Sequence, residues 1–317
     1  MCALYAGVDL TGLADGLLLP VPLMAALVLA RALEIAPGRH GRAIALVLGV
    51  GALAGAWLAW RLRVGTGDYS PDSLAIALAM VGAVTLALIP QRARVLVLRP
   101  LGLDPDSPVH AVAAVGVIVT VAAAMVLFRE LQREAPTAPI PSYVSDEVAA
   151  LLSDAGLAFA GVGFLITRGL RASLARLDVR PIRARVVLLA LAAAVAFHLV
   201  VGLMEHAESV WLPDISKLED RFRYEFVGLP PWLGAVLVSV AAGLGEELVF
   251  RGALQPRLGI VPTALVFATF HVQYQLPGMA MIFVVGLALG VLKQRTSTTF
   301  TACVHVFYDI GAFVFSD

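Results

Sequence analysis

The sequence predicts an all-α fold, a polytopic bundle of about eight to ten transmembrane helices. The composition predicts it first: 60% of the 317 residues are hydrophobic, 15% are charged, and the mean hydropathy is +0.88. A soluble domain is nearer half apolar and a quarter charged. The chain also divides into apolar segments that approach the length of about 20 residues that a helix needs to cross a bilayer.

These apolar segments follow one another along the chain. The predicted spans are Leu17–Ile35, Ala43–Trp60, Leu74–Ile89, Val109–Phe128, Val148–Ile166, Val186–Met204, Trp232–Phe250, Ile260–His271, Gly278–Leu292 and Thr298–Phe315. Several are shorter than ideal, and one contains Ser153 and Asp154. The expected number of spans is therefore a range rather than a single value.

The basic residues support this order of spans. If the chain begins outside, roughly two thirds of the 23 Lys and Arg residues lie in cytoplasmic segments, as the positive-inside rule requires. The richest segment, Arg168–Arg185, divides the chain into residues 1–185, which are N-terminal spans of unassigned role, and residues 186–317, a C-terminal core. We interpret this arginine run as a topology determinant and, alternatively, as a docking surface for anionic lipid.

Charge and composition also bear on partners and location. Lys and Arg together equal Asp and Glu, at 23 each, which gives no argument for a nucleic-acid partner. The abundance of Arg, Ala, Val, Leu and Gly suggests a GC-rich genome, so we expect a multi-pass protein of a bacterial inner (cytoplasmic) membrane. The two cysteines lie far apart and have no metal-type spacing.

Ionisable residues occur inside the last spans, where they are costly and usually mark function. They lie in three motifs: Gly-Leu-Gly-Glu246-Glu247-Leu-Val-Phe-Arg251-Gly, Phe267-Ala-Thr-Phe-His271 and His305-Val-Phe-Tyr-Asp309. Glu247 and Arg251 are four residues apart, so they share a helix face and can neutralise each other. Glu246 is rotated away from that face and lacks this partner.

The three motifs are expected to lie at one depth in the membrane. At about 1.5 Å per residue, His271 is roughly 16 Å along its helix from Ile260, and Asp309 is about as far from Thr298. The spacing therefore predicts one water-containing pocket with Glu246, two imidazoles and a further carboxyl. A buried Glu beside a His can deprotonate water, and His or a protonated Asp can donate to an oxyanion. The same groups could instead bind a metal through two His and a carboxylate.

The order and spacing of these motifs resemble the CPBP family of intramembrane proteases. That family comprises CAAX prenyl endopeptidases of the Rce1 type, bacteriocin-processing and immunity proteins, and related glutamic intramembrane proteases. The resemblance covers Trp232–Gly311. It implies Glu246 as general base, His271 as its assistant, His305 and Asp309 as the oxyanion-stabilising pair, and Glu247 with Arg251 as structural support. Prenyl endopeptidases commonly have Asn where this chain has Asp309, which makes a prenylated substrate less secure.

The expected function is thus an intramembrane endopeptidase that cleaves near the C-terminus of a membrane-anchored or lipidated protein or peptide. No cofactor is expected. One alternative is a zinc-dependent version of the same protease, with Glu246, His271, His305 and Asp309 as ligands. Others are a non-catalytic immunity or binding protein, or a proton-coupled transporter.

Overall fold

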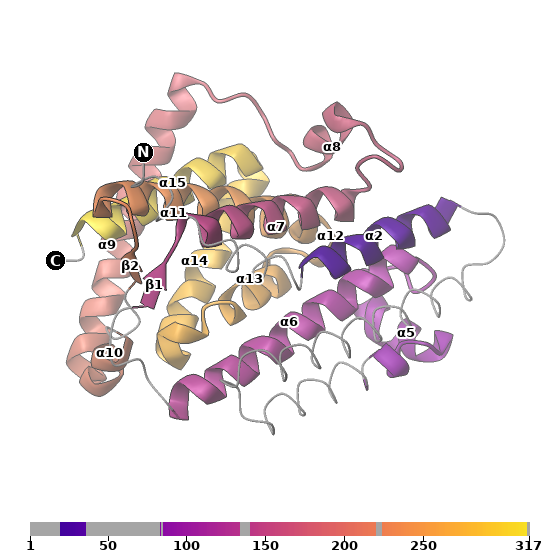
Figure 1. The fold of residues 1–317 in the computed structure, drawn as a ribbon, viewed down its shortest axis with the longest axis horizontal. Coiled ribbons are helices and arrows are strands. Elements are labelled where there is room, and N and C mark those ends of the chain that lie inside the picture. The colour runs from indigo at the N-terminus through magenta and orange to yellow at the C-terminus, as the bar shows by residue number, and fades with distance from the viewer. Residues whose placement is uncertain (1–19, 36–82, 84, 134–139, 220–223, 316–317) are drawn as a thin grey trace.

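The computed structural model describes residues 20–35, 83, 85–133, 140–219 and 224–315, which are almost entirely helical (Figure 1). The longer helices are α2 (Pro20–Ile35), α6 (Pro108–Arg133), α7 (Val144–Val162), α9 (Ala184–Trp211), α11 (Pro231–Glu247), α13 (Ile260–Thr269), α14 (Gln275–Arg295) and α15 (Thr298–Phe315). The shorter ones are α5 (Gln91–Leu98), η2 (Arg99–Leu101), α8 (Leu170–Arg176), α10 (Pro213–Glu219), η3 (Leu248–Leu254), α12 (Gln255–Leu258) and η4 (Val272–Tyr274). The predicted all-α class is confirmed.

Several of these helices are suited to a bilayer. Among the described residues, three helical stretches are long and apolar enough to cross a membrane: Ala184–Trp211, Pro231–Leu258 and Val272–Arg295. Shorter apolar helices accompany them, and the chain is an integral membrane protein. The predicted span Ala43–Trp60 and most of Leu74–Ile89 lie outside the described residues, so the total of eight to ten spans stays a prediction.

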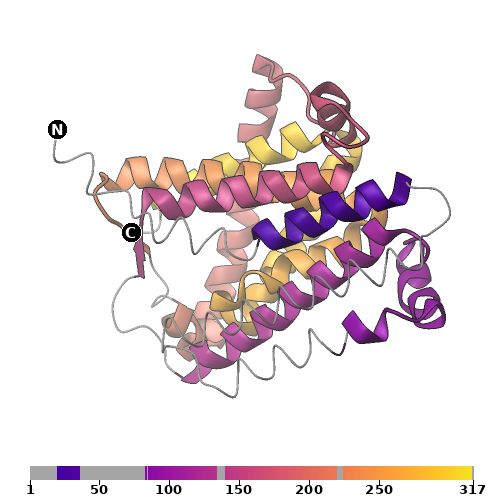
Figure 2. The same ribbon diagram turned by 45° about the vertical axis from the view of Figure 1, so that its right-hand side comes forward.

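The helices form one bundle in which segments distant in sequence are neighbours. α11 packs against α15 on one side and against α7 on the other, and α9 crosses α15 (Figures 1 and 2). α2 lies between α7 and α6 and packs against both, while α13 and α14 pack together and α6 contacts α13. Contacts between α7 and α11 cross the predicted boundary between residues 1–185 and 186–317, and that division stays a prediction.

Two short strands form the sheet of the described ranges. β1 (Ile140–Ser142) pairs in parallel with β2 (Tyr224–Phe226), with Ile140 opposite Tyr224. Both lie in loops that the distribution of basic residues assigns to the outer side of the membrane. The pairing therefore connects the loop before α7 to the loop before α11.

α7 has clear start and stop signals. The Tyr143 N–H donates to the Asp146 carboxylate at 2.9 Å, which closes a capping box at the first turn. Gly163 ends the helix with a φ of +83°, a left-handed conformation that glycine adopts without steric cost. These signals set where α7 begins and ends.

Gly243 brings the backbones of α11 and α15 into contact. A Cβ atom on this residue would lie 2.6 Å from Cγ2 of Val306 and 2.8 Å from its backbone nitrogen. Small residues at such crossings allow close approach of membrane helices. The contact lies one turn before Glu246 and next to His305, so it brings two of the predicted motifs together.

Substituting Gly243 by alanine is expected to destabilise the protein by about 1–3 kcal/mol, because α11 and α15 must separate to admit the methyl group. The melting temperature of the detergent-solubilised protein measures this. Gly202→Ala is the matched control, since a Cβ on Gly202 in α9 would meet nothing within 4 Å. Equal melting temperatures for the two variants would show that the α11–α15 contact is not tight.

Candidate active site

The first motif lies where an α-helix passes into a π-helix. α11 ends at Glu247, and Leu248–Leu254 continue as the π-helix η3. The Gln255 N–H, at the far end, bonds to the Phe250 carbonyl five residues earlier, the pattern of a π turn. Such turns are rare and occur frequently at functional sites. The transition places both glutamates on the last α turn and Arg251 inside the π turn.

Glu247 and Arg251 form a buried ion pair. Their side chains are 0% and 1% exposed, and Arg251 Nε lies 3.5 Å from Glu247 Oε2. The Arg251 guanidinium also lies 4.4 Å from the centroid of the Phe267 ring, a cation–π contact. Each buried charge is thus compensated, which a low-dielectric interior requires.

His305 lies between three carboxylates. Its Nδ1 is 3.3 Å from Glu247 Oε1, while its Nε2 is 3.5 Å from Asp309 Oδ2 and 3.9 Å from Glu246 Oε2. Because an ionised carboxylate only accepts hydrogen bonds, Nδ1 is the donor to Glu247. Glu247 therefore orients the imidazole so that Nε2 faces Glu246 and Asp309.

The two glutamates differ in how much of the side chain is exposed to solvent. The Glu246 side chain is 22% exposed and that of Asp309 is 21%, whereas Glu247 is inaccessible. Oε2 of Glu246 is itself buried, and it has no hydrogen-bond partner within the described part of the chain. Glu246 is thus the carboxylate of the pair that remains available to a water molecule or a substrate.

His271, which we expected to assist Glu246, makes its side-chain hydrogen bond to a backbone carbonyl. It lies at the break between α13 and η4, where its Nδ1 is 3.1 Å from the Phe267 carbonyl. The Phe267 ring is 4.9 Å from the His271 ring and 6.1 Å from the His305 ring, measured between centroids. Among the described residues, His271 and Glu246 share no hydrogen bond or ion pair, and the histidine that approaches Glu246 is His305.

Asp154 on α7 is a further carboxylate at this site that sequence reasoning missed. A Cβ on Gly245 would lie 2.9 Å from Asp154 Oδ2, so α7 approaches α11 next to Glu246. Asp154 is also close enough to Glu246 for their negative charges to repel each other. The sequence feature that could have identified Asp154 is its carboxylate in an otherwise apolar predicted span, because charged residues are rare inside membranes.

A zinc site needs three or four ligand atoms that converge on one point. Within the described part of the chain, no group of three or more His, Cys, Asp or Glu side chains is arranged to hold a metal. One nitrogen of each histidine is already engaged, with Glu247 for His305 and with the Phe267 carbonyl for His271, and zinc-bound histidines also engage their second nitrogen in this way. Zinc binding by Glu246, His271, His305 and Asp309 therefore stays a hypothesis for experiment.

Comparison with known proteins gives one match. Residues 228–311 match the family model of the Rce1-like type II CAAX prenyl endopeptidases, and this segment contains all three motifs. No curated protein and no solved structure matches the chain. The chain is thus an integral membrane protein in which residues 228–311 resemble the Rce1-like type II CAAX prenyl endopeptidases.

Proposed function

We propose that this protein is a glutamic-type intramembrane endopeptidase that hydrolyses a peptide bond near the C-terminus of a membrane-anchored or lipidated protein. The observation that carries the proposal is the position of His305, held by Glu247 and directed at the accessible carboxylate Glu246 within an Rce1-like domain. A carboxylate and an imidazole that flank one space can activate water and receive its proton. Burial strengthens these interactions because the local dielectric is low.

In the proposed reaction, Glu246 accepts a proton from water, and the water oxygen attacks the scissile carbonyl carbon. The carbonyl π electrons move to oxygen, and the resulting oxyanion accepts a hydrogen bond from Nε2–H of protonated His305. Collapse of the intermediate breaks the C–N bond. The leaving amine takes the proton that Glu246 had accepted, so the carboxylate is regenerated.

Asp309 and His271 have supporting roles in this proposal. The 3.5 Å separation of Asp309 Oδ2 from His305 Nε2 supports a role for Asp309 in orienting His305 and stabilising its positive charge. With Nδ1 of His271 directed at the Phe267 carbonyl, its Nε2 is the atom left to contact water or the substrate. Binding by His271 would assist Glu246 from the substrate side.

The substrate class is tested by comparing membrane and surface proteomes of cells that carry the native protein or Glu246→Ala. We expect one or a few proteins to keep an uncut C-terminal segment in the Glu246→Ala strain. Glu205→Ala is the control, because Glu205 is an exposed glutamate of α9 outside the motifs. Identical C-termini in all strains would contradict a processing function.

The zinc alternative needs a separate measurement. A glutamic protease should keep its activity after prolonged treatment with a chelator, and the purified protein should contain less than one equivalent of zinc. Loss of activity with chelator and its recovery with added zinc would favour the metal-dependent version.

A further inference from the structure

Four arginines from different parts of the chain lie near one another at one end of the bundle. They are Arg31 of α2, Arg168 in the turn after α7, Arg176 of α8 and Arg257 of α12. The pKa of the Arg176 guanidinium lies below its usual value, mainly because the group is buried and also because the other three positive charges repel it. All four belong to segments that the distribution of basic residues assigns to the cytoplasmic side.

Backbone carbonyls hold three of these side chains in place. Arg31 Nη2 donates to the Gly161 carbonyl at 3.4 Å, and Arg168 donates to the Val162 carbonyl, so both meet the negative end of the α7 dipole. Arg176 Nη1 donates to the Gly252 carbonyl at 3.2 Å. Carbonyls orient guanidinium groups without neutralising their charge, so the cluster stays positive.

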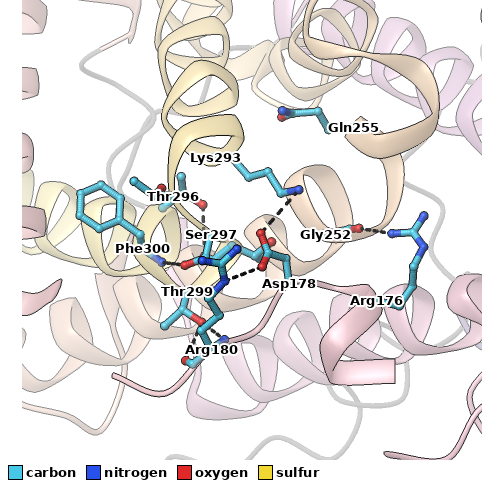
Figure 3. Close-up of polar contacts among 12 residues, drawn as sticks. Arg176, Asp178, Arg180, Gly252, Gln255, Lys293, Thr296, Ser297, Thr299 and Phe300 are labelled. Carbon is cyan, nitrogen blue, oxygen red and sulfur yellow. Dashed lines mark hydrogen bonds and ion pairs between the residues drawn. The ribbon is translucent and has the colours of Figure 1, made fainter. Parts of the chain in front are cut away.

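Of the neighbouring carboxylates, Asp178 is engaged outside the cluster and Glu34 pairs with one of its members. Figure 3 shows Asp178 between Arg180 and Lys293, at 2.7 Å and 3.9 Å, while Arg176 extends away from it to Gly252. Glu34 pairs with Arg31 and also accepts a hydrogen bond from Ser107. Among the described residues, Arg168, Arg176 and Arg257 have no carboxylate partner within ion-pair distance. The cluster therefore carries a net positive charge that an anion would compensate.

Apolar side chains next to the cluster indicate which anion it fits. Leu165, Ile166 and Leu170 lie in and after the turn that contains Arg168, and they are 79%, 36% and 56% exposed. Leu165 has a φ of +64°, an uncommon conformation for a residue other than glycine, at the tip of the turn. Exposed leucines beside arginines are typical of a segment at the membrane interface.

We propose that Arg31, Arg168, Arg176 and Arg257 bind the phosphate of an anionic phospholipid headgroup in the cytoplasmic leaflet. The Leu165–Leu170 turn inserts beside the acyl chains of that lipid. Guanidinium groups suit this role because they donate paired hydrogen bonds to phosphate oxygens. The lipid would join α2, α7, α8 and α12 at the end of the bundle where η3 and α12 continue from the first motif.

The test uses the full-length purified protein and measures binding of phosphatidylglycerol relative to phosphatidylcholine by native mass spectrometry. We expect Arg176→Gln/Arg257→Gln to reduce this preference by about tenfold or more, since basic residues near the surface attract anionic lipid. Arg183→Gln/Arg185→Gln removes the same charge from exposed positions at the start of α9 and should keep the preference. Arg176→Lys/Arg257→Lys preserves the charge without the paired hydrogen bonds and should keep part of the preference, which separates lost binding from misfolding.

Three results would overturn the proposal. The first is an unchanged preference in Arg176→Gln/Arg257→Gln. The second is an equal loss in Arg183→Gln/Arg185→Gln, which would mean general attraction to cytoplasmic positive charge. The third is displacement of phosphatidylglycerol by millimolar inorganic phosphate, which would indicate a site for a free anion.

Discussion

Replacing Glu246 by glutamine is expected to slow peptide hydrolysis by about a hundredfold or more and to leave the protein folded. The amide has nearly the same shape as the carboxylate, but it cannot accept the proton of the attacking water. Glu246 makes no ion pair with Arg251, and its side chain is partly exposed. The packing of α11 therefore does not depend on the charge of Glu246. Turnover of a fluorogenic C-terminal peptide in detergent or nanodiscs measures the effect.

The control for this variant is Glu205→Gln, an equivalent change on α9 outside the motifs. Its turnover should equal that of the native protein, and both variants should have native melting temperatures. Glu246→Gln with native turnover would exclude Glu246 as the base. In that case a binding or immunity role becomes the better interpretation, because binding does not require proton transfer.

Removing Glu247 alone is expected to destabilise the protein by about 3–5 kcal/mol, because it breaks a buried ion pair. Glu247→Leu leaves Arg251 buried with an uncompensated charge, since the three guanidinium nitrogens have no hydrogen-bond partner there and Glu247 supplies the ion pair. The stacked Phe267 ring offsets only part of that loss. Thermal unfolding in detergent, followed by loss of the folded fraction, measures it.

The double variant Glu247→Leu/Arg251→Met separates charge burial from packing. It removes both charges and keeps the volume, so we expect most of the lost stability to return. Hydrolysis should not return, because His305 loses the acceptor that orients Nδ1. A double variant no more stable than Glu247→Leu would show that the pair contributes through its shape rather than its charge.

The sequence predicted the features that depend on local periodicity. Apolar runs of bilayer length identified α9, α11 and α14, and four-residue spacing identified the Glu247–Arg251 and His305–Asp309 contacts. These follow from the geometry of one helix, which the sequence encodes directly. The expectation that the first and third motifs share a depth also agrees with the contact between Glu246 and His305.

Features that depend on how helices meet were not predictable in this way. The approach of Asp154 to Glu246 results from the pairing of α7 with α11, and no periodicity in either helix encodes it. The position of His271 depends on the break after Thr269, because a continuous helix would direct its side chain differently. The β1–β2 pair consists of three residues on each side, too few for an alternating pattern to stand out.

The π-helix Leu248–Leu254 has a consequence for how this chain is aligned with other proteins. A π turn contains roughly one residue more than the α turn it replaces. A relative that lacks this turn would need a one-residue gap between Glu247 and Gln255. The two glutamates precede the π-helix and Arg257 follows it. An alignment without the gap would therefore place only one of these two sides in the correct columns. Pairwise identities across this helix would be underestimated, and an arginine that is equivalent in space to Arg251 would fall one column away from it.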